Sequence, residues 1–145
     1  MATTSPNPWA ELRARPHLAL VWTDLPLGVR GMTDGTTIYL ARGLSQRERR
    51  VALCHELIHV EMGHTSHQPP AVERIVERET ARRLLPDMDQ VRAALAWATT
   101  LDEAAHELWV TSAVLEARLS DMSASRLVHD WVHAQPPTGD ETGSH

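Results

Sequence analysis

The chain has 145 residues, a formal net charge of −5 and an isoelectric point near 6.0. This charge balance indicates no general affinity for nucleic acid or for an acidic membrane surface. A single cysteine, Cys54, excludes a disulfide framework and a cysteine-based zinc site. No apolar stretch has the length of a membrane span, and the first residues lack the pattern of a signal peptide. We therefore expect a cytoplasmic protein with no membrane partner.

The length allows one folded domain with a small appendage. Residues 1–8 are expected to be a disordered N-terminus, and residues 9–99 a folded core. A helical extension is expected over residues 100–134, followed by a disordered tail over residues 135–145.

Three short stretches early in the core have the composition of strands. They are residues 17–22, a weaker candidate at 28–32, and residues 36–40, which include the only tyrosine, Tyr39. Asp34 and Gly35 form a hairpin turn signal between the second and third stretches. A small antiparallel sheet is therefore predicted ahead of the first long helix, which gives an α+β fold. An edge strand in this position can pair with an extended peptide.

The next stretch carries the main chemical signal, an H-E-x-x-H string formed by His55, Glu56 and His59. It lies in residues 51–62, which are apolar on nearly every side and predict a buried helix that begins with a capping box at residues 45–48. Positions four apart share one helix face, so both imidazoles can bind one zinc ion. The carboxylate of Glu56 would then lie beside the open position of the metal and accept a proton from bound water.

A structural interpretation competes with this one, in which both histidines bond carbonyl groups inside an ordinary core helix. It requires three polar side chains to be buried without a shared purpose, at a cost of several kcal/mol. The metal site is the favoured interpretation because motif and helical context agree. Cys54 is expected to be a buried structural cysteine, and Tyr39 a packing residue rather than a group that polarises a substrate carbonyl.

A catalytic zinc site needs a third protein ligand. The candidates downstream are His64, His67, Glu61, Glu73, Glu77 and Glu79. Residues 71–85 predict a second helix that ends before Pro86, and it carries Glu73 and Glu77 four positions apart. One of these two can bind zinc while the other holds a ligand histidine. His64 and His67 are expected in an exposed loop, and Glu79 on a solvated face paired with arginine.

Two stretches of sequence together carry a family resemblance. They are His55-Glu56-Leu57-Ile58-His59-Val60-Glu61-Met62-Gly63 and Glu73-x-x-Val76-Glu77-x-x-Thr80-Ala81-x-x-Leu84-Leu85-Pro86. With them the chain resembles the ImmA/IrrE family of metallopeptidases, in its short phage and mobile-element form, over roughly residues 17–120. The resemblance implies a zincin-like pair of active-site helices of the gluzincin type.

The same resemblance implies roles for individual residues. His55, His59 and Glu73 would bind Zn²⁺, Glu56 would be the general base, and Glu77 would orient a histidine. It also implies a protein substrate, a repressor or regulator of a phage or mobile element. The chain is thus interpreted as a zinc-dependent endopeptidase.

Residues 101–119 read as helix, turn and helix, which resembles a DNA-binding helix-turn-helix. Arg118 is their only arginine, against the acidic residues Asp102, Glu103, Glu107 and Glu116. Phosphate contacts need clustered basic residues, so an accessory bundle or a partner-binding surface is the favoured interpretation. A further helix is predicted from Ser123 onward. Trp97, Trp109 and Trp131 are expected to anchor the packing of this helical part.

Two other function classes stay open beside the peptidase. One is a DNA-binding transcription regulator with a structural zinc, and the other is a protein that binds its partner without cutting it. A substitution at Glu56 separates them, because only the peptidase needs a general base.

The acidic extension predicts no sequence-specific binding to duplex DNA at physiological salt, because its helices repel phosphate. A gel shift titrated with salt measures this. A sequence-dependent shift that disappears when residues 100–145 are removed would contradict the prediction.

Overall fold

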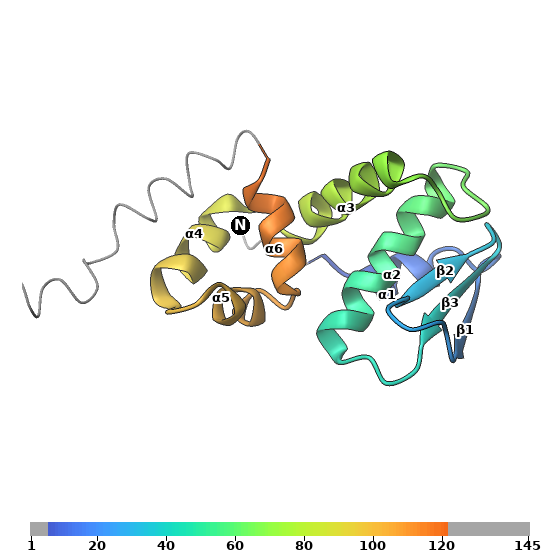
Figure 1. Ribbon diagram of the computed structural model, residues 1–145, viewed down its shortest axis with the longest axis horizontal. Coiled ribbons are helices and arrows are strands. Elements are labelled where there is room, and N and C mark those ends of the chain that lie inside the picture. The colour runs from blue at the N-terminus through green and yellow to red at the C-terminus, as the bar shows by residue number, and fades with distance from the viewer. Residues whose placement is uncertain (1–5, 122–145) are drawn as a thin grey trace, which may run out of the picture.

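A computed structural model describes residues 6–121 of the chain. Its elements, in chain order, are α1 (Pro8–Arg13), β1 (Ala19–Thr23), β2 (Gly31–Thr33), β3 (Thr37–Ala41), α2 (Gln46–Glu61), α3 (Pro70–Leu84), α4 (Met88–Trp97), α5 (Leu101–Glu107) and α6 (Ser112–Leu119). The α+β class is thereby confirmed. The sheet lies at one end of the molecule and α4 to α6 at the other, with α2 and α3 between them (Figure 1). None of the helices described is long and apolar enough to cross a membrane.

The three strands form a mixed sheet in the order β1-β3-β2, so the prediction of an antiparallel sheet is wrong for one of its two pairs. The hairpin at Asp34 and Gly35 is confirmed, because β2 and β3 are antiparallel. β1 and β3 are parallel. Residues 24–30 carry the chain from β1 past the position of β3 to β2, and the hairpin then places β3 between the two. β3 is therefore the central strand, and β2 is left at an edge.

The helix α2 has defined signals at both ends. The Ser45 hydroxyl accepts from the backbone N–H of Glu48 at 3.2 Å, and the Glu48 carboxylate accepts from the N–H of Ser45 at 2.9 Å. This is the predicted capping box. At the other end Gly63 has a φ of 79°, in the left-handed region that a glycine adopts without steric cost. The helix thus ends where the sequence supplies the glycine.

Two faces of α2 belong to two different hydrophobic cores, and a third face carries the histidines. One pair of apolar side chains four positions apart packs with the sheet, the next pair packs with the helical half, and the third pair is polar. These pairs are Leu53 and Leu57 with the sheet, Cys54 and Ile58 with the helices, and His55 and His59. Three consecutive residues of α2 therefore point in three directions: Leu53 to the sheet core, Cys54 to the helical core and His55 to the histidine pair. The burial expected for Cys54 is confirmed.

Arginines on the first two turns of α2 connect it to the helical end of the molecule. Arg47 donates to the carbonyl of Val110 at 2.8 Å, and Arg50 to the carbonyl of Trp109 at 2.7 Å. These carbonyls lie just beyond the C-terminal end of α5, where the helix dipole is negative. The arginines therefore fix the α5–α6 turn against the start of α2.

The tryptophans do not anchor the helical end as predicted. Trp97 is 69% exposed and Trp109 is 57% exposed, while Trp131 lies outside the described residues, as does the helix predicted from Ser123. The core there is instead made of smaller side chains, chiefly Val76, Val91, Leu95, Ala104, Ala105, Val110 and Leu115. The indoles of Trp97 and Trp109 lie outside this core.

Because α2 supplies both cores, truncating one of its buried side chains destabilises the whole fold. Ile58→Ala is expected to lower the free energy of unfolding by about 2–5 kcal/mol, the usual cost of such a cavity. Ile75→Ala on α3 is the matched control, because Ile75 is 51% exposed and should change stability by at most about 0.5 kcal/mol. Chemical denaturation of both variants measures this, and equal losses would show that the burial of Ile58 is not the cause.

Candidate metal centre

Three side chains from two helices converge at one end of α2. Nε2 of His55 lies 3.0 Å from Oε1 of Glu73, and Nε2 of His59 lies 3.1 Å from the same oxygen. The two Nε2 atoms are 3.2 Å apart. The histidines come from adjacent turns of α2, and Glu73 comes from the first turn of α3, which packs along α2. The structure thus brings together the three residues that the resemblance named as ligands.

The donor set and its spacing fit a metal ion. Ligand atoms of a tetrahedral ion with bonds of about 2.0–2.1 Å lie about 3.3 Å from one another. The three distances of 3.0, 3.1 and 3.2 Å therefore need only a small expansion. Two imidazole nitrogens and one carboxylate oxygen are also a donor set that zinc accepts. Among residues 6–121 these three form the one group with metal-ligand spacing.

The electrostatics of the group also favour metal binding. Burial lowers the pKa of His59, which opposes the effect of the Glu73 charge and keeps the ring neutral, the form that binds metal. Burial raises the pKa of Glu73, but its hydrogen bonds to the histidines and their charges outweigh this and leave the pKa below its usual value. Glu73 is therefore ionised at neutral pH, as a ligand must be.

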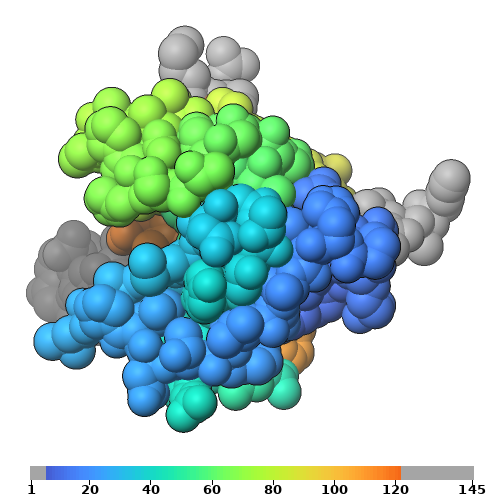
Figure 2. Space-filling view, turned by 90° about the vertical axis from the view of Figure 1, so that its right-hand side faces the viewer, coloured from blue at the N-terminus to red at the C-terminus, as the bar shows by residue number. Residues whose placement is uncertain are grey.

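The three side chains differ in exposure, which gives the group an open side. His59 is 6% exposed, while His55 is 21% and Glu73 is 22% exposed. A molecule from solvent can therefore approach between His55 and Glu73. Figure 2 views this end of the molecule, and its surface is hollowed between the green atoms around α3 and the blue atoms of the sheet. A catalytic metal needs such an approach, whereas a structural site is closed.

Glu56 is buried beside this group and against the sheet. A Cβ atom placed on Gly31 of β2 would lie 3.1 Å from Cγ and 3.2 Å from Oε2 of Glu56, so the glycine provides the room for this carboxyl group. Burial, and next the charge of Glu73, raise the pKa of Glu56 to about 8. The carboxyl group therefore holds a proton at neutral pH until a nearby positive charge lowers its pKa again. Sequence reasoning named Glu56 but missed Gly31.

The other candidates for third ligand are engaged elsewhere or exposed. Glu61 forms ion pairs with Arg15 and Arg83, and Glu79 with Arg83, which confirms the arginine pairing expected for Glu79. Glu77 is exposed one turn beyond Glu73 and lies outside the group. Its proposed alternative roles as a ligand or as a partner of a ligand histidine gain no support.

Two further histidines follow α2. His67 is exposed, as expected. His64 is not the exposed loop residue that the sequence predicts, because it is half-buried and its Nδ1 lies 2.9 Å from Nδ1 of His59. The sequence signal for this contact is a glycine at the end of the helix followed directly by a histidine, because such a glycine turns the next residue back toward the helix.

Tyr39 faces away from this site. Ile38 and Leu40 are buried beneath α2, and successive side chains of a strand point to opposite faces, so Tyr39 points from the other face of the sheet. The structure therefore gives it no position from which to polarise a group bound at the histidines.

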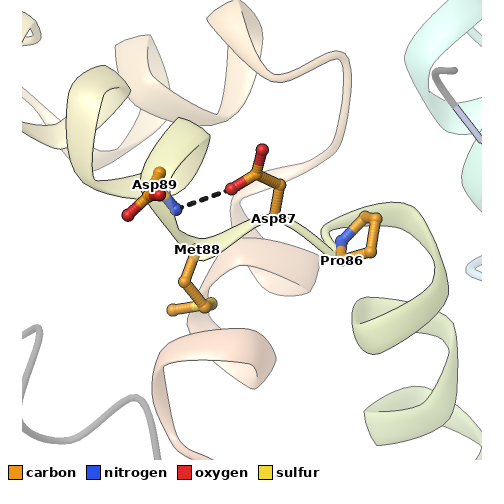
Figure 3. A pocket seen from close by; sticks show the side chains of 4 residues that line it. All are labelled: Pro86, Asp87, Met88 and Asp89. Atoms are coloured by element: carbon orange, nitrogen blue, oxygen red, sulfur yellow. Dashed lines mark hydrogen bonds between the residues drawn. The ribbon is translucent and has the colours of Figure 1, made fainter. Parts of the chain in front are cut away.

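A second depression, of about 440 Å³, lies at the junction of α3 and α4, away from the histidines. Pro86, Asp87, Met88 and Asp89 line it. Figure 3 shows that the Asp87 carboxylate accepts a hydrogen bond of 2.9 Å from the backbone N–H of Asp89. This carboxylate caps the N-terminus of α4. The depression therefore surrounds a helix cap, and its polar group is already used in capping.

Comparison of the chain with known protein families, with curated proteins and with solved structures found no match.

The geometry predicts that Glu73 and not Glu77 determines metal affinity. Glu73→Gln removes an anionic ligand and should weaken Zn²⁺ binding by more than the roughly 10–100-fold that loss of a ligand's hydrogen-bond partner costs. Glu77→Gln, on the same helix and exposed, should bind Zn²⁺ as the wild type does. Titration against a chelator of known affinity measures both variants, and a larger loss in Glu77→Gln would reverse the assignment.

Proposed function

We propose that this protein is a zinc-dependent endopeptidase. The observation that carries the proposal is a buried carboxyl group, Glu56, on the same helix as the two histidines and close to Glu73 of α3. A purely structural metal site has no use for an additional ionisable group that is buried at such cost. A general base needs this position, because it must lie within reach of the molecule whose proton it takes.

The reaction divides between the ion and the chain. When bound by His55, His59 and Glu73, zinc supplies a Lewis acid that polarises the substrate carbonyl and acidifies a water molecule. Glu56 would take a proton from the attacking water and give it to the nitrogen of the leaving amine.

The edge strand β2 gives an extended substrate a place to bind. Arg30 and Asp34 form backbone bonds with β3, through Ala41 N to Arg30 O at 2.9 Å and Asp34 N to Thr37 O at 3.3 Å. Residues alternate in an antiparallel pair, so Gly31 and Thr33 point their N–H and C=O groups away from β3. A peptide paired there would pass Gly31, and Gly31 adjoins Glu56.

The substrate class comes from the sequence resemblance to the ImmA/IrrE family. It leads us to include in the proposal a cytoplasmic protein substrate, namely a repressor of a phage or mobile element encoded near this protein. Within the acidic helical extension, Arg118 is 9% exposed and donates to the carbonyl of Leu85, so it is not displayed to phosphate groups. This favours a protein partner over DNA.

Glu56→Gln tests the assignment of the base. The variant should bind zinc in wild-type stoichiometry, because Glu56 is not a ligand and glutamine preserves its shape. It should lose turnover by about 10²-fold or more, because an amide cannot accept the proton of water. Elemental analysis, and mass spectrometry of a candidate repressor after incubation, measure the two properties.

Two controls complete the experiment. Glu77→Gln makes the same chemical change at an exposed site and should cleave at the wild-type rate, whereas His59→Ala should lose both metal and cleavage. A Glu56→Gln variant that cuts as fast as the wild type would remove Glu56 from the mechanism and favour a structural metal.

A further inference from the structure

His64 lies next to a ligand histidine without belonging to the group of ligands. Its Nδ1 is 2.9 Å from Nδ1 of His59, and the two ring centroids are 5.1 Å apart. The group with metal-ligand spacing contains His55, His59 and Glu73 only, among the residues that the structure describes. His64 thus contacts the side of the His59 ring that faces away from the proposed metal.

We propose that His64 is a positioning residue that holds His59 in the orientation and tautomer required for metal binding. The inference rests on the proposed metal site and adds to it a residue that neither the H-E-x-x-H string nor the family resemblance assigns. His64 would touch neither the metal nor the substrate, and it would act through His59 alone.

The end of α2 explains why these two rings meet. The N–H of Gly63 donates to the carbonyl of Val60 at 3.0 Å, and the N–H of His64 donates to the carbonyl of His59 at 2.9 Å. This pair of bonds is a Schellman motif, which brings the second residue after the helix back over the last turn. Usually that residue makes an apolar contact with the turn. Here the contact is between two imidazoles, so a hydrogen bond replaces it.

The chemistry of imidazole then fixes the proton positions. If Nε2 of His59 offers its lone pair to a metal, the proton of the neutral ring must be on Nδ1. Nδ1 of His59 therefore donates, and Nδ1 of His64 must accept, which places the proton of His64 on its own Nε2. Backbone carbonyls and carboxylates usually receive this bond from a ligand histidine. In this chain a neutral imidazole receives it.

The local structure gives this contact its rigidity. His64 is held by two bonds to the same residue, one from its backbone N–H and one through its ring. Gly63 makes the turn possible through its φ of 79°. The His59 side chain is only 6% exposed, so its ring has little room to rotate once the partner is in place.

The test compares two substitutions at one position. His64→Leu places an apolar side chain over the turn but offers no acceptor for the His59 N–H. His64→Asn supplies an oxygen acceptor close to the position of Nδ1. We expect His64→Leu to weaken zinc binding by about 10–100-fold and His64→Asn to recover most of that loss. His67→Leu, an exposed histidine in the same loop, should bind zinc as the wild type does.

Three readouts distinguish positioning from a structural role. Zinc affinity is measured by competition with a chelator, the ligand field by the visible absorption of the Co²⁺-substituted proteins, and folding by thermal unfolding of the metal-free proteins. His64→Leu should change the first two and leave the third close to that of His67→Leu. Equal zinc affinities in wild type and His64→Leu, or equal losses in His64→Leu and His64→Asn, would overturn the inference.

The outcome is separable from that of the proposed function. A wild-type protein that binds zinc but cleaves no repressor, with the losses at His64 as expected, would refute the peptidase and retain the positioning role. Cleavage with no effect of His64→Leu on zinc would refute the positioning role alone. A wild-type protein that binds no zinc would refute both.

Discussion

The four-residue spacing of side chains along α2 is the constraint on which the rest of the structure depends. Because this helix is surrounded by the sheet, by α3 and by α1, each of its faces has a fixed neighbour. Leu53 and Leu57 belong to the sheet, and Ile58 to the helical core. A third face carries His55 and His59, which meet Glu73 of α3. The histidines are therefore placed by the packing of the apolar residues next to them.

The same constraint brings together two glutamates, Glu73 and Glu56, whose pKa values are shifted in opposite directions. Glu73 approaches from α3 and is ionised, because its bonds to the histidines overcome its partial burial. Glu56 lies on the sheet side, where burial and the charge of Glu73 favour its protonated form. The two environments thus move the pKa values of neighbouring carboxyl groups in opposite directions. Glu73 owes its lowered pKa to the histidines, and Glu56 owes its raised pKa chiefly to burial.

Features that depend on nearby residues could be predicted from the sequence. The capping box at Ser45, the hairpin at Asp34 and the common face of His55 and His59 all follow from spacing within a few positions. The pairing of Glu73 with the histidines came from a family resemblance, since the spacing alone allowed Glu77 equally. The local features share one cause, because a helix or a tight turn converts a short sequence directly into geometry.

Features that depend on how elements meet could not be predicted. The alternation of side chains in a strand is the same for parallel and antiparallel neighbours, so it could not reveal that β1 and β3 are parallel. Gly31 has no side chain to signal its contact with Glu56. Trp109 contacts Arg50 through its backbone carbonyl while its indole is exposed, which composition alone does not indicate. His64 looked like a loop residue because its role arises only when the helix ends at Gly63.

The bonds from Arg47 and Arg50 to the α5–α6 turn have a mechanical consequence. Each joins a charged donor to a carbonyl, and such bonds contribute about 1.5–3 kcal/mol. A partner that displaces this turn must either break both bonds or pull the first two turns of α2 along with it. The helix is rigid over its length, so a force applied at the far end of the molecule reaches His55 and His59 without passing through the sheet.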